Sequence, residues 1–587
     1  MRRRLMVAAS SSSYITSCFT SFRARGSPFI NAYHHRAFLS RRSTMNPCGD
    51  AIYSGPVYPP PPKRESDAVF SVARGMESDT GSGGVLEFLE SLKNYEKLGV
   101  PKGAGIESAD GFDLARMHRL LSALGDPHFR YPAIHVAGTK GKGSTAAFIS
   151  NILRAQGYFV GSYTSPHILS IHERIIAGKT EVPITQVAFQ NLFEDNRKII
   201  EAQIKSEQGA LTYFEVLTAL AYKYFAQVNV DIAIIEAGLG GARDATNVIP
   251  SANLAVAIIT NIGKEHLAAL GGSLETIALA KSGIIKQGRP VILGGPLDPN
   301  IEGLIRQVAD SKQSKVICAF GEGIHCKVED IKLDADNGGA VQCCNLHINP
   351  TIYEESLNWN LDNKCLQLQM VGSHQLNNAT TAICAILCLR DQGWIVEDDA
   401  IWSGLKNTHA IGRFQVMSKA ASMKTGCNPS TIVLDGAHTG TSAKVLVSTL
   451  KMVFSSEPLA LVVAMASDKD HVEFCAQLLA GAAPRVVVVT EVMVAGCRLR
   501  STPACVLADC LNQAAKLQNK KVIHEHANDE IKDSELDSYI IVAESDSIVS
   551  GIKKASELLH HVGQKGAICV TGSLHAVSEV LSYLMTN

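Results

Sequence analysis

A glycine-rich segment that carries two lysines is suited to bind phosphate groups. It reads Val136-Ala137-Gly138-Thr139-Lys140-Gly141-Lys142-Gly143-Ser144 and lies between an apolar run, 131–136, and an amphipathic run, 144–156. We expect a strand followed by a helix, so that backbone N–H groups at the start of the helix face an anion. Lys142 would then contact the terminal phosphates of a nucleotide. The alternative is a tight strand–helix turn whose glycines serve only to adopt positive φ.

The residue order in this segment departs from that of the common nucleotide-binding loop. The common loop places Ser or Thr directly after its lysine, whereas Gly143 separates Lys142 from Ser144 here. The hydroxyl of Ser144 or Thr145 would help to hold the phosphate or its metal ion. The segment therefore predicts a variant phosphate-binding loop.

The elements that would position these residues alternate along the chain. From Gly84 onward, short apolar runs alternate with amphipathic runs, which is the pattern of a doubly wound parallel sheet. In such sheets, ligands bind at the carboxyl ends of the strands. In the first part of the chain we expect strands at 133–137, 159–163, 231–236, 254–260 and 290–293.

A second alternating series begins near Thr431. We expect its strands at 431–434, 460–464, 486–490 and 567–570. The fold class is therefore α/β with two domains, a doubly wound domain similar to P-loop ATPases over 85–412 and a smaller α/β domain over 413–587. Residues 411–413 would form the hinge. The polar, cysteine-rich region 320–368 predicts strands or loops that decorate the first domain.

The amino-terminal segment differs in charge from the rest of the chain. Net charge is −1 over 587 residues, but residues 1–45 hold eight Arg and no acid, so the remainder carries −9. An Arg- and Ser-rich leader without acids is typical of an organellar transit peptide, and its high Arg content favours the mitochondrial matrix. We expect residues 1–84 to be this leader and a linker, with a disordered cytosolic tail as the alternative. The acidic remainder argues against nucleic acid as a partner.

Hydropathy and cysteine content exclude several other classes of protein. No apolar run reaches the roughly 18 residues of a membrane-spanning helix, so we expect no membrane partner. The fifteen cysteines, from Cys18 to Cys569, include no CxxC pair. This distribution argues against a metal ribbon or a disulfide framework. Cys384 and Cys388, one helical turn apart, are expected to be buried apolar groups.

Five motifs together resemble those of one enzyme family. In chain order they are the glycine-rich segment, Tyr163-Thr164-Ser165-Pro166-His167, Glu236-Ala237-Gly238-Leu239-Gly240-Gly241, Asp244-Ala245-Thr246-Asn247 and Asp435-Gly436-Ala437-His438. They resemble the folylpolyglutamate synthase and dihydrofolate synthetase family of ATP-dependent amide ligases, within the Mur-ligase superfamily. The resemblance runs from about residue 86 to the carboxyl terminus and is greatest to the plant-type, single-activity mitochondrial branch.

The resemblance implies how the chain would bind ATP. The loop 138–144 would hold the phosphates, with Lys142 as a catalytic residue. Asn378, Arg413 and Asp435 match family positions that hold adenine, ribose and phosphate. Arg413, at the hinge, would couple the nucleotide to domain closure. A helix cap is the alternative for Asn378.

The resemblance also implies a magnesium site made of Ser165, Glu236 and His266. Magnesium prefers oxygen ligands, and Glu236 ends an apolar run where an ionised carboxylate without a cation would be costly. Lys281 matches the catalytic lysine that this superfamily carbamylates. A carbamate is an anionic oxygen donor and forms on a deprotonated amine, which burial favours. The alternatives are a packing or surface histidine at His266 and an exposed helix lysine at Lys281.

Two further groups of residues would bind the organic substrates. The family's pteroate-binding residues match Thr212, Tyr213, Phe214, Glu215, Arg243, Asp244 and Ala245. Phe214 would stack on the pterin ring and Asp244 would accept hydrogen bonds from pterin nitrogens, whereas Thr246 and Asn247 would stabilise their loop. His438, as a catalytic residue, and Ser573 would contact the incoming glutamate. Helix capping is the alternative for Ser573.

The implied reaction joins 7,8-dihydropteroate to L-glutamate with cleavage of ATP, a step of folate biosynthesis. ATP would phosphorylate the carboxylate to an acyl phosphate that the amine attacks, while protein groups position the reactants and neutralise charge. A folylpolyglutamate synthase, which extends tetrahydrofolate, and a bifunctional enzyme are the alternatives. A nucleotide-switch GTPase is disfavoured because the chain has no Asn/Thr-Lys-x-Asp segment to bind guanine. We expect ATP and Mg²⁺ as cofactors, and a monomer.

Overall fold

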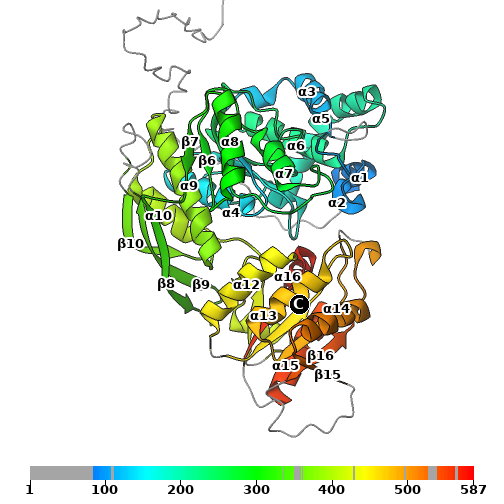
Figure 1. Ribbon diagram of the computed structural model, residues 1–587. Helices are drawn as coiled ribbons and strands as arrows, with labels where there is room; N and C mark the ends of the chain where they lie inside the picture. Colours follow the sequence, from blue (N-terminus) through cyan, green and yellow to red (C-terminus); the bar gives the residue numbers. More distant parts are fainter. Residues whose placement is uncertain are drawn as a thin grey trace, which may run out of the picture. The chain divides into compact units, whose positions relative to one another are not determined.

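Three β-sheets organise the part of the chain that the computed structural model describes (Figure 1). That part comprises residues 83–106, 112–334, 336–348, 359, 361–427, 430–455, 457–494, 498–525, 539–561 and 566–586. The predicted leader and linker lie outside it, apart from residues 83–84, so the transit peptide stays a prediction. None of the described helices is long and apolar enough to span a membrane.

The first domain is built on a seven-stranded sheet with the order β3-β2-β4-β1-β5-β6-β7. Neighbouring strands are parallel except the edge strand β3, which is antiparallel to β2. The strands are β1 Ala133–Ala137, β2 Val160–Tyr163, β3 Ile175–Gly178, β4 Ile232–Glu236, β5 Leu254–Ile259, β6 Val291–Leu293 and β7 Val316–Cys318. In the pairing of β1 with β4, Val136 lies opposite Glu236. The glycine-rich segment and Glu236 therefore leave the sheet side by side.

Helices cover both faces of this sheet because its strands are apolar on both sides. In β1, Ala133 and Ala137 belong to one core, and Ile134 and Val136 belong to the other. The first core includes residues of α1 Gly83–Ser91, α3 Leu114–Ala123, α5 Gln186–Ser206, α6 Tyr213–Gln227, α7 Leu274–Ser282 and α8 Pro299–Ser311. The second core includes residues of α4 Lys142–Ala155, α9 Ser373–Asp391 and α10 Asp398–Asn407. Three short helices are α2 Tyr95–Leu98, η1 Pro127–Phe129 and η2 Ile171–Arg174.

The second domain repeats this plan with a sheet of order β11-β12-β17-β13-β14-β16-β15, in which only the edge strand β11 is antiparallel. The strands are β11 Gln415–Val416, β12 Thr431–Leu434, β13 Leu459–Val463, β14 Val486–Thr490, β15 Lys521–His524, β16 Tyr539–Ser545 and β17 Ala567–Thr571. One core includes residues of α12 Gly440–Val453, α13 His471–Ala482 and α14 Ala504–Leu517. The other includes residues of α11 Lys419–Lys424, α15 Ile548–His561 and α16 Leu574–Thr586. A short helix, η4 Arg498–Arg500, precedes α14.

The cysteine-rich region forms a separate antiparallel sheet of order β10-β9-β8. Its strands are β8 Ile324–Leu333, β9 Ala340–Ile348 and β10 Leu361–Leu368. Leu346 and Leu366 pack in the core that contains α9, as expected for a decoration of the first domain. At the other end of β9, Ala340 joins a core of the second domain, and the N–H of Gly339 donates to the carbonyl oxygen of Val416 at 3.0 Å. The sheet therefore contacts both domains.

The predicted α/β class and two-domain organisation are confirmed. The strands predicted at 133–137, 431–434 and 486–490 match the structure, and the other predicted strands differ by one residue at one or both ends. The edge strands β3, β7, β11 and β15 were not predicted, because edge strands are short and only partly apolar. The interior strand β16 was not predicted either. Residues 411–413 lie between α10 and β11, and the predicted domain boundaries stay predictions.

Candidate active site

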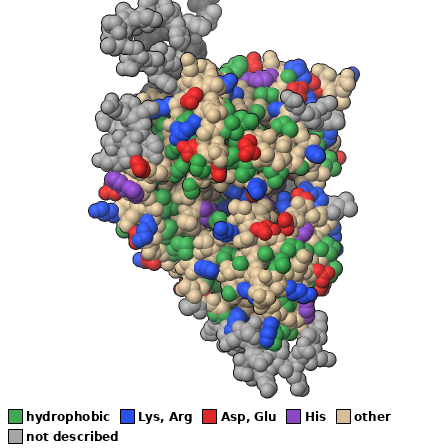
Figure 2. All heavy atoms as spheres, viewed as in Figure 1, with side chains coloured by type: hydrophobic (Ala, Val, Ile, Leu, Met, Phe, Trp, Pro, Cys, Tyr) green, Lys and Arg blue, Asp and Glu red, His purple; other side chains and the backbone are tan. Residues whose placement is uncertain are grey.

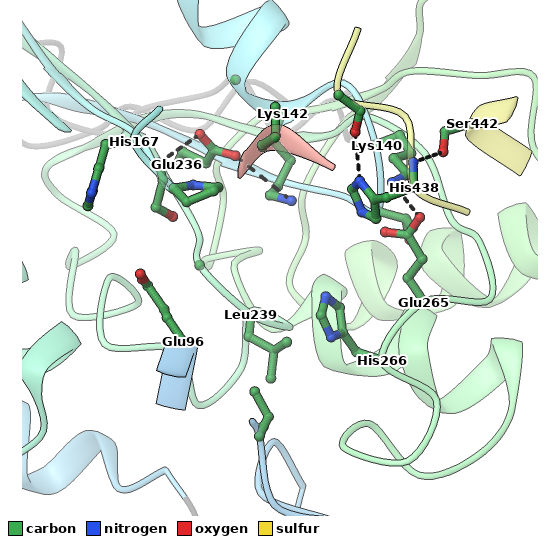
Figure 3. Close-up of a pocket in the computed structure, with 18 of the residues that line it drawn as sticks. Glu96, Lys140, Lys142, His167, Glu236, Leu239, Glu265, His266, His438 and Ser442 are labelled. Atoms are coloured by element: carbon green, nitrogen blue, oxygen red, sulfur yellow. Dashed lines mark hydrogen bonds and ion pairs between the residues drawn. The ribbon is translucent and has the colours of Figure 1, made fainter. Parts of the chain in front are cut away.

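Residues of both domains line a cavity of about 1140 Å³. Of the residues that the sequence predicted to be functional, all except Gly138, Thr145 and Lys281 line it. Figure 2 shows Lys, Arg and His side chains beside Asp and Glu around the hollowed middle of the drawn face. The close-up in Figure 3 shows Lys142 directed toward Glu236, and Lys140 grouped with Glu265 and His438.

The glycine-rich segment forms the turn between β1 and α4. α4 begins at Lys142, directly after Gly141, whose φ is 83°. A Cβ at Gly141 would lie 2.3 Å from Oδ1 of Asn378, so glycine is required both for the φ angle and for the space. The N–H groups in the first turn of α4 have no partner within the helix and can bind an anion. The predicted strand–turn–helix geometry is confirmed, and phosphate binding stays a prediction.

Two of the predicted metal ligands, Glu236 and Ser165, are in contact. The backbone N–H of Ser165 donates to Oε2 of Glu236 at 3.2 Å, and Nζ of Lys142 lies 3.8 Å from Oε1 of Glu236. Glu236 is 4% exposed, and burial raises its pKa while the charge of Lys142 opposes the increase. A buried carboxylate that has one cation 3.8 Å away is suited to bind a second cation as well.

His266, the third predicted metal ligand, is an exposed side chain on the same cavity, at a positive φ of 55°. Within the described residues, no three or more His, Cys, Asp or Glu side chains form a group that could hold a metal ion. The predicted set contains only one carboxylate and one imidazole, with a hydroxyl as the third donor. These donors suit magnesium, which takes its remaining oxygen ligands from water and phosphate.

Lys281 is buried in α7, so the alternative of an exposed helix lysine is wrong. It is 4% exposed, and its amine donates to the carbonyl oxygen of Gly138 at 2.6 Å. Burial, together with the charge of Lys142, lowers the pKa of Lys281 to about 7. A large fraction of the amine is therefore neutral near pH 7, which is the state that carbamylation requires.

Lys140 connects the glycine-rich segment to the second domain through an acidic residue. Its Nζ lies 2.6 Å from Oε1 of Glu265, which also accepts a hydrogen bond from the hydroxyl of Thr439 at 3.5 Å. The neighbouring ring of His438 places Nδ1 2.8 Å from the carbonyl oxygen of Gly436. A carbonyl oxygen only accepts, so Nδ1 carries the proton. Burial lowers the pKa of His438 to about 3, which keeps Nε2 unprotonated and able to accept a hydrogen bond.

The three residues predicted to contact the nucleotide lie on separate elements. Asn378 is inside α9, whose N-cap is Gly372, so the helix-cap alternative is wrong. Asp435 follows β12 and accepts hydrogen bonds from the N–H groups of Phe414 and Ala437, both at 2.9 Å. Arg413 lies between α10 and β11 with an exposed side chain.

Several predicted pteroate-binding residues instead build the amino terminus of α6. The hydroxyl of Thr212 accepts from the N–H of Glu215 at 3.2 Å, and Glu215 accepts from the N–H of Thr212 at 2.8 Å, which is a capping box. Glu215 also lies 3.2 Å from Nε of Arg116. Phe214 is half-buried, and a Cβ at Gly238 would lie 2.5 Å from its ring. Phe214 is thus the member of this group best placed to contact a planar ligand.

The structure argues against the predicted contact between Asp244 and pterin nitrogens. Asp244 is 3% exposed and accepts from the N–H groups of Leu239 and Thr246 and from the hydroxyl of Thr246. An ionised carboxylate accepts about four hydrogen bonds, so most of its capacity is used within its own loop. Asn247 donates to the carbonyl oxygens of Ala242 and Gly283, both at 3.1 Å. The predicted role of Thr246 and Asn247 as loop stabilisers is confirmed.

The other predicted substrate residues have structural partners as well. Arg243 donates to the carbonyl oxygens of Phe112, at 2.7 Å, and Ile106. Ala245 is 8% exposed. The hydroxyl of Ser573 accepts from the N–H of His575 at 3.1 Å, where α16 begins, so the capping alternative is confirmed for Ser573.

A charged group in this cavity was not predicted from the sequence. Nη1 and Nη2 of Arg174 donate to the two carboxylate oxygens of Glu96 at 2.7 and 2.6 Å, and Nε donates to Nδ1 of His167 at 2.8 Å. All three residues line the cavity. Glu96 precedes Arg174 by 78 positions in the chain, and no local pattern signals such a pair.

Comparison with known proteins gives matches over both domains. Residues 136–386 match the family described as Mur ligase middle domain, and residues 419–583 match the dihydrofolate synthetase C-terminal domain. The chain is similar to the dihydrofolate synthase/folylpolyglutamate synthase of Bacillus subtilis, with 32% identity over 61% of this chain and 76% of that protein. It is 29% identical to the dihydrofolate synthetase of Saccharomyces cerevisiae, over 61% of this chain and 76% of that protein. The solved folylpolyglutamate synthase of Mycobacterium tuberculosis, complexed with ADP, superposes with a TM-score of 0.66 and 25% identity, over 85% of this chain and 97% of that chain.

Proposed function

The chain belongs to the dihydrofolate synthase/folylpolyglutamate synthase family, and on this premise we propose that it joins 7,8-dihydropteroate to L-glutamate with cleavage of ATP to ADP and phosphate. Family membership supports the coarser activity, the ATP-dependent ligation of glutamate to a folate-type acid. The observation that carries the proposal is one cavity that joins the amino terminus of α4 and the buried Glu236 to the aromatic ring of Phe214.

The phosphate half of the cavity supports activation of a carboxylate by ATP. The first turn of α4 supplies N–H groups, and Lys142 supplies a positive charge beside them. Phosphoryl transfer depends mainly on such positioning and charge stabilisation. Arg413, on the segment between the sheets, would add a second cation when nucleotide is bound.

Magnesium, when bound, would neutralise the charge of the phosphate groups. Glu236, Ser165 and His266 are the residues that would hold it. Lys142 and Glu236 already neutralise each other in part across 3.8 Å. Lys142 is therefore held next to the place where phosphates would enter.

The acceptor half of the cavity supports a planar substrate with one carboxylate. Phe214 offers a half-buried aromatic face, and Leu239 also lines the cavity (Figure 3). The neutral ring of His438 would accept a hydrogen bond from the amine of glutamate across the cavity. Folylpolyglutamate synthesis is the second candidate, because the Bacillus subtilis relative carries both activities in its name.

The test is a product assay with the purified protein. ATP and L-glutamate are supplied with either dihydropteroate or tetrahydrofolate, and products are resolved by mass. We expect dihydrofolate and ADP from the first acceptor and little product from the second. Extension of tetrahydrofolate with no product from dihydropteroate would overturn the proposal in favour of a polyglutamate synthase.

We propose the mitochondrial matrix as the compartment, on the charge asymmetry of residues 1–45. A full-length fluorescent fusion should enter mitochondria, and removal of residues 1–45 should abolish import but leave ligase activity in vitro unchanged. A cytosolic or plastid signal from the full-length fusion would contradict this assignment.

A further inference from the structure

Arg174 presents a buried guanidinium at the cavity, and this guanidinium is paired with a carboxylate of the same chain. Arg174 is 1% exposed, and its two terminal nitrogens donate in parallel to Oε1 and Oε2 of Glu96. Its Nε donates to His167, and its guanidinium carbon lies 5.8 Å from the ring centroid of Tyr213. These contacts fix the plane of the guanidinium. A fixed, buried guanidinium fork is a carboxylate receptor.

The pair lies in the acceptor half of the cavity. Tyr213, which packs on Arg174, is the neighbour in sequence of Phe214. Figure 3 draws Glu96 and His167 on one side, and Lys140, Glu265 and His438 on the other. The charge of Arg174 also acts on Glu236, where it opposes the increase in pKa that burial causes. The fork is therefore near both the expected reaction centre and the expected acceptor.

The side chain of Glu96 is more exposed to solvent than that of its partner, Arg174. It lies in the short helix α2, and its side chain is 37% exposed while that of Arg174 is 1% exposed. Burial raises the pKa of Glu96, but its hydrogen bonds and charge interaction with Arg174 lower it to a net value below the usual one. Glu96 is therefore ionised at neutral pH, and its charge would repel a second anion placed beside it.

The two possible acceptors differ in the number of their carboxylates. Dihydropteroate has one carboxylate, which is the group that reacts. A folate with a glutamyl tail has two, so that one carboxylate reacts and the other must be placed nearby. The guanidinium of Arg174 would already be paired with Glu96, and the Glu96 carboxylate would repel the spare carboxylate. Like charges in a partly desolvated site disfavour a ligand strongly.

We propose that Glu96 is a specificity-determining residue that restricts the enzyme to acceptors with a single carboxylate, by filling the Arg174 fork that would otherwise hold the spare carboxylate of a glutamyl tail. This inference rests on the proposed function, because it explains a preference for dihydropteroate over glutamylated folates. It assigns Glu96 no part in the chemical step.

The experiment compares kcat/KM for dihydropteroate and for tetrahydrofolate in the wild type, E96Q and E96A. The ratio of the tetrahydrofolate value to the dihydropteroate value should rise by about tenfold or more in E96A, mainly through a lower KM for tetrahydrofolate. E96Q should give a smaller rise, because it removes the charge but leaves the fork filled. The matched control is E207Q, which disrupts a bidentate pair between Arg119 and Glu207 outside the cavity lining and should leave the ratio unchanged.

A binding measurement separates this role from a purely structural one. Free acetate should raise the Tm of E96A but not that of the wild type, because only the variant exposes an empty guanidinium fork. E96Q keeps a hydrogen-bond acceptor for Arg174, so its acceptor ratio remains informative if E96A folds poorly.

Unchanged acceptor ratios in E96A and E96Q, with a wild type that prefers dihydropteroate, would overturn the inference and leave the proposed function intact. A wild type that extends tetrahydrofolate as well as it uses dihydropteroate would overturn both. The wild-type assay thus distinguishes the two failures.

Discussion

The side-chain amine of Lys281 donates a hydrogen bond to the carbonyl oxygen of Gly138 at 2.6 Å. Neither residue lines the cavity of the described structure, although most of the residues predicted to be functional do. The bond ties α7 to the first glycine of the glycine-rich segment. Any change in the state of Lys281 therefore acts directly on the segment that would hold the phosphates.

Lys281→Ala should be nearly inactive and partly rescued by formate or acetate, because a small carboxylate can replace a carbamate as the anionic donor. Turnover of dihydropteroate with and without added carboxylate measures this. Lys286→Ala is the matched control, since Lys286 is a second, half-buried lysine whose pKa burial lowers to about 8. It should keep most of the activity and show no rescue. An active Lys281→Ala protein would limit Lys281 to a structural role.

Lys281 should also make stability depend on pH. Burial lowers its pKa from 10.5 to about 7, so between these values the unfolded chain binds a proton that the folded amine does not. The free energy of unfolding therefore rises with pH across this window, by at most about 1.4 kcal/mol per pH unit, and this contribution is lost as pH falls through 7.

The measurement is urea unfolding of the wild type and Lys281→Met between pH 7 and 10.5 in buffer free of carbon dioxide. The difference between the two proteins isolates this lysine from other titrating groups. Parallel pH profiles would show that the amine of Lys281 does not titrate in this window.

Lys142→Ala should reduce turnover by roughly 100-fold or more while the fold is retained, because a preorganised cation stabilises charge that develops in the transition state. The rate of ADP formation at saturating ATP measures the turnover, and the Tm shows whether the fold is retained. Lys198→Ala, an exposed lysine of α5, is the control and should leave the rate unchanged. Near-normal turnover in Lys142→Ala would contradict the assignment of Lys142 to the ATP site.

Asp244→Asn should act on stability more than on recognition of the acceptor. The amide nitrogen would place a donor opposite the N–H group of Leu239 or of Thr246, which costs about 1–3 kcal/mol for a buried partner left unpaired. We expect a lower Tm and a KM for dihydropteroate that changes little. A raised KM with an unchanged Tm would restore Asp244 as a residue that binds the pterin.

The glycine-rich segment and the alternation of apolar runs show which structural features can be predicted from the sequence. Both signals are local: a strand or helix is recognisable from the periodicity of neighbouring residues, and a turn before a helix is recognisable from its glycines. For this reason β1, β12 and β14 match their predicted bounds, and the turn between β1 and α4 has the predicted geometry. The carboxyl ends of parallel strands meet at one edge, which is why most of the predicted site residues line one cavity.

The roles of individual polar side chains were decided only by the tertiary structure. Asp244 and Glu215 lie in matching motifs, yet their oxygens are used by nearby N–H and guanidinium groups. Glu96 and Arg174 carry no local signal, because 78 positions separate them and only packing of α2 against the end of η2 brings them together. The sequence by itself determined the α/β elements and the family, since these depend on local periodicity and motif order. The partner that each buried charge finds depends on long-range contacts, and these exist only in the folded chain.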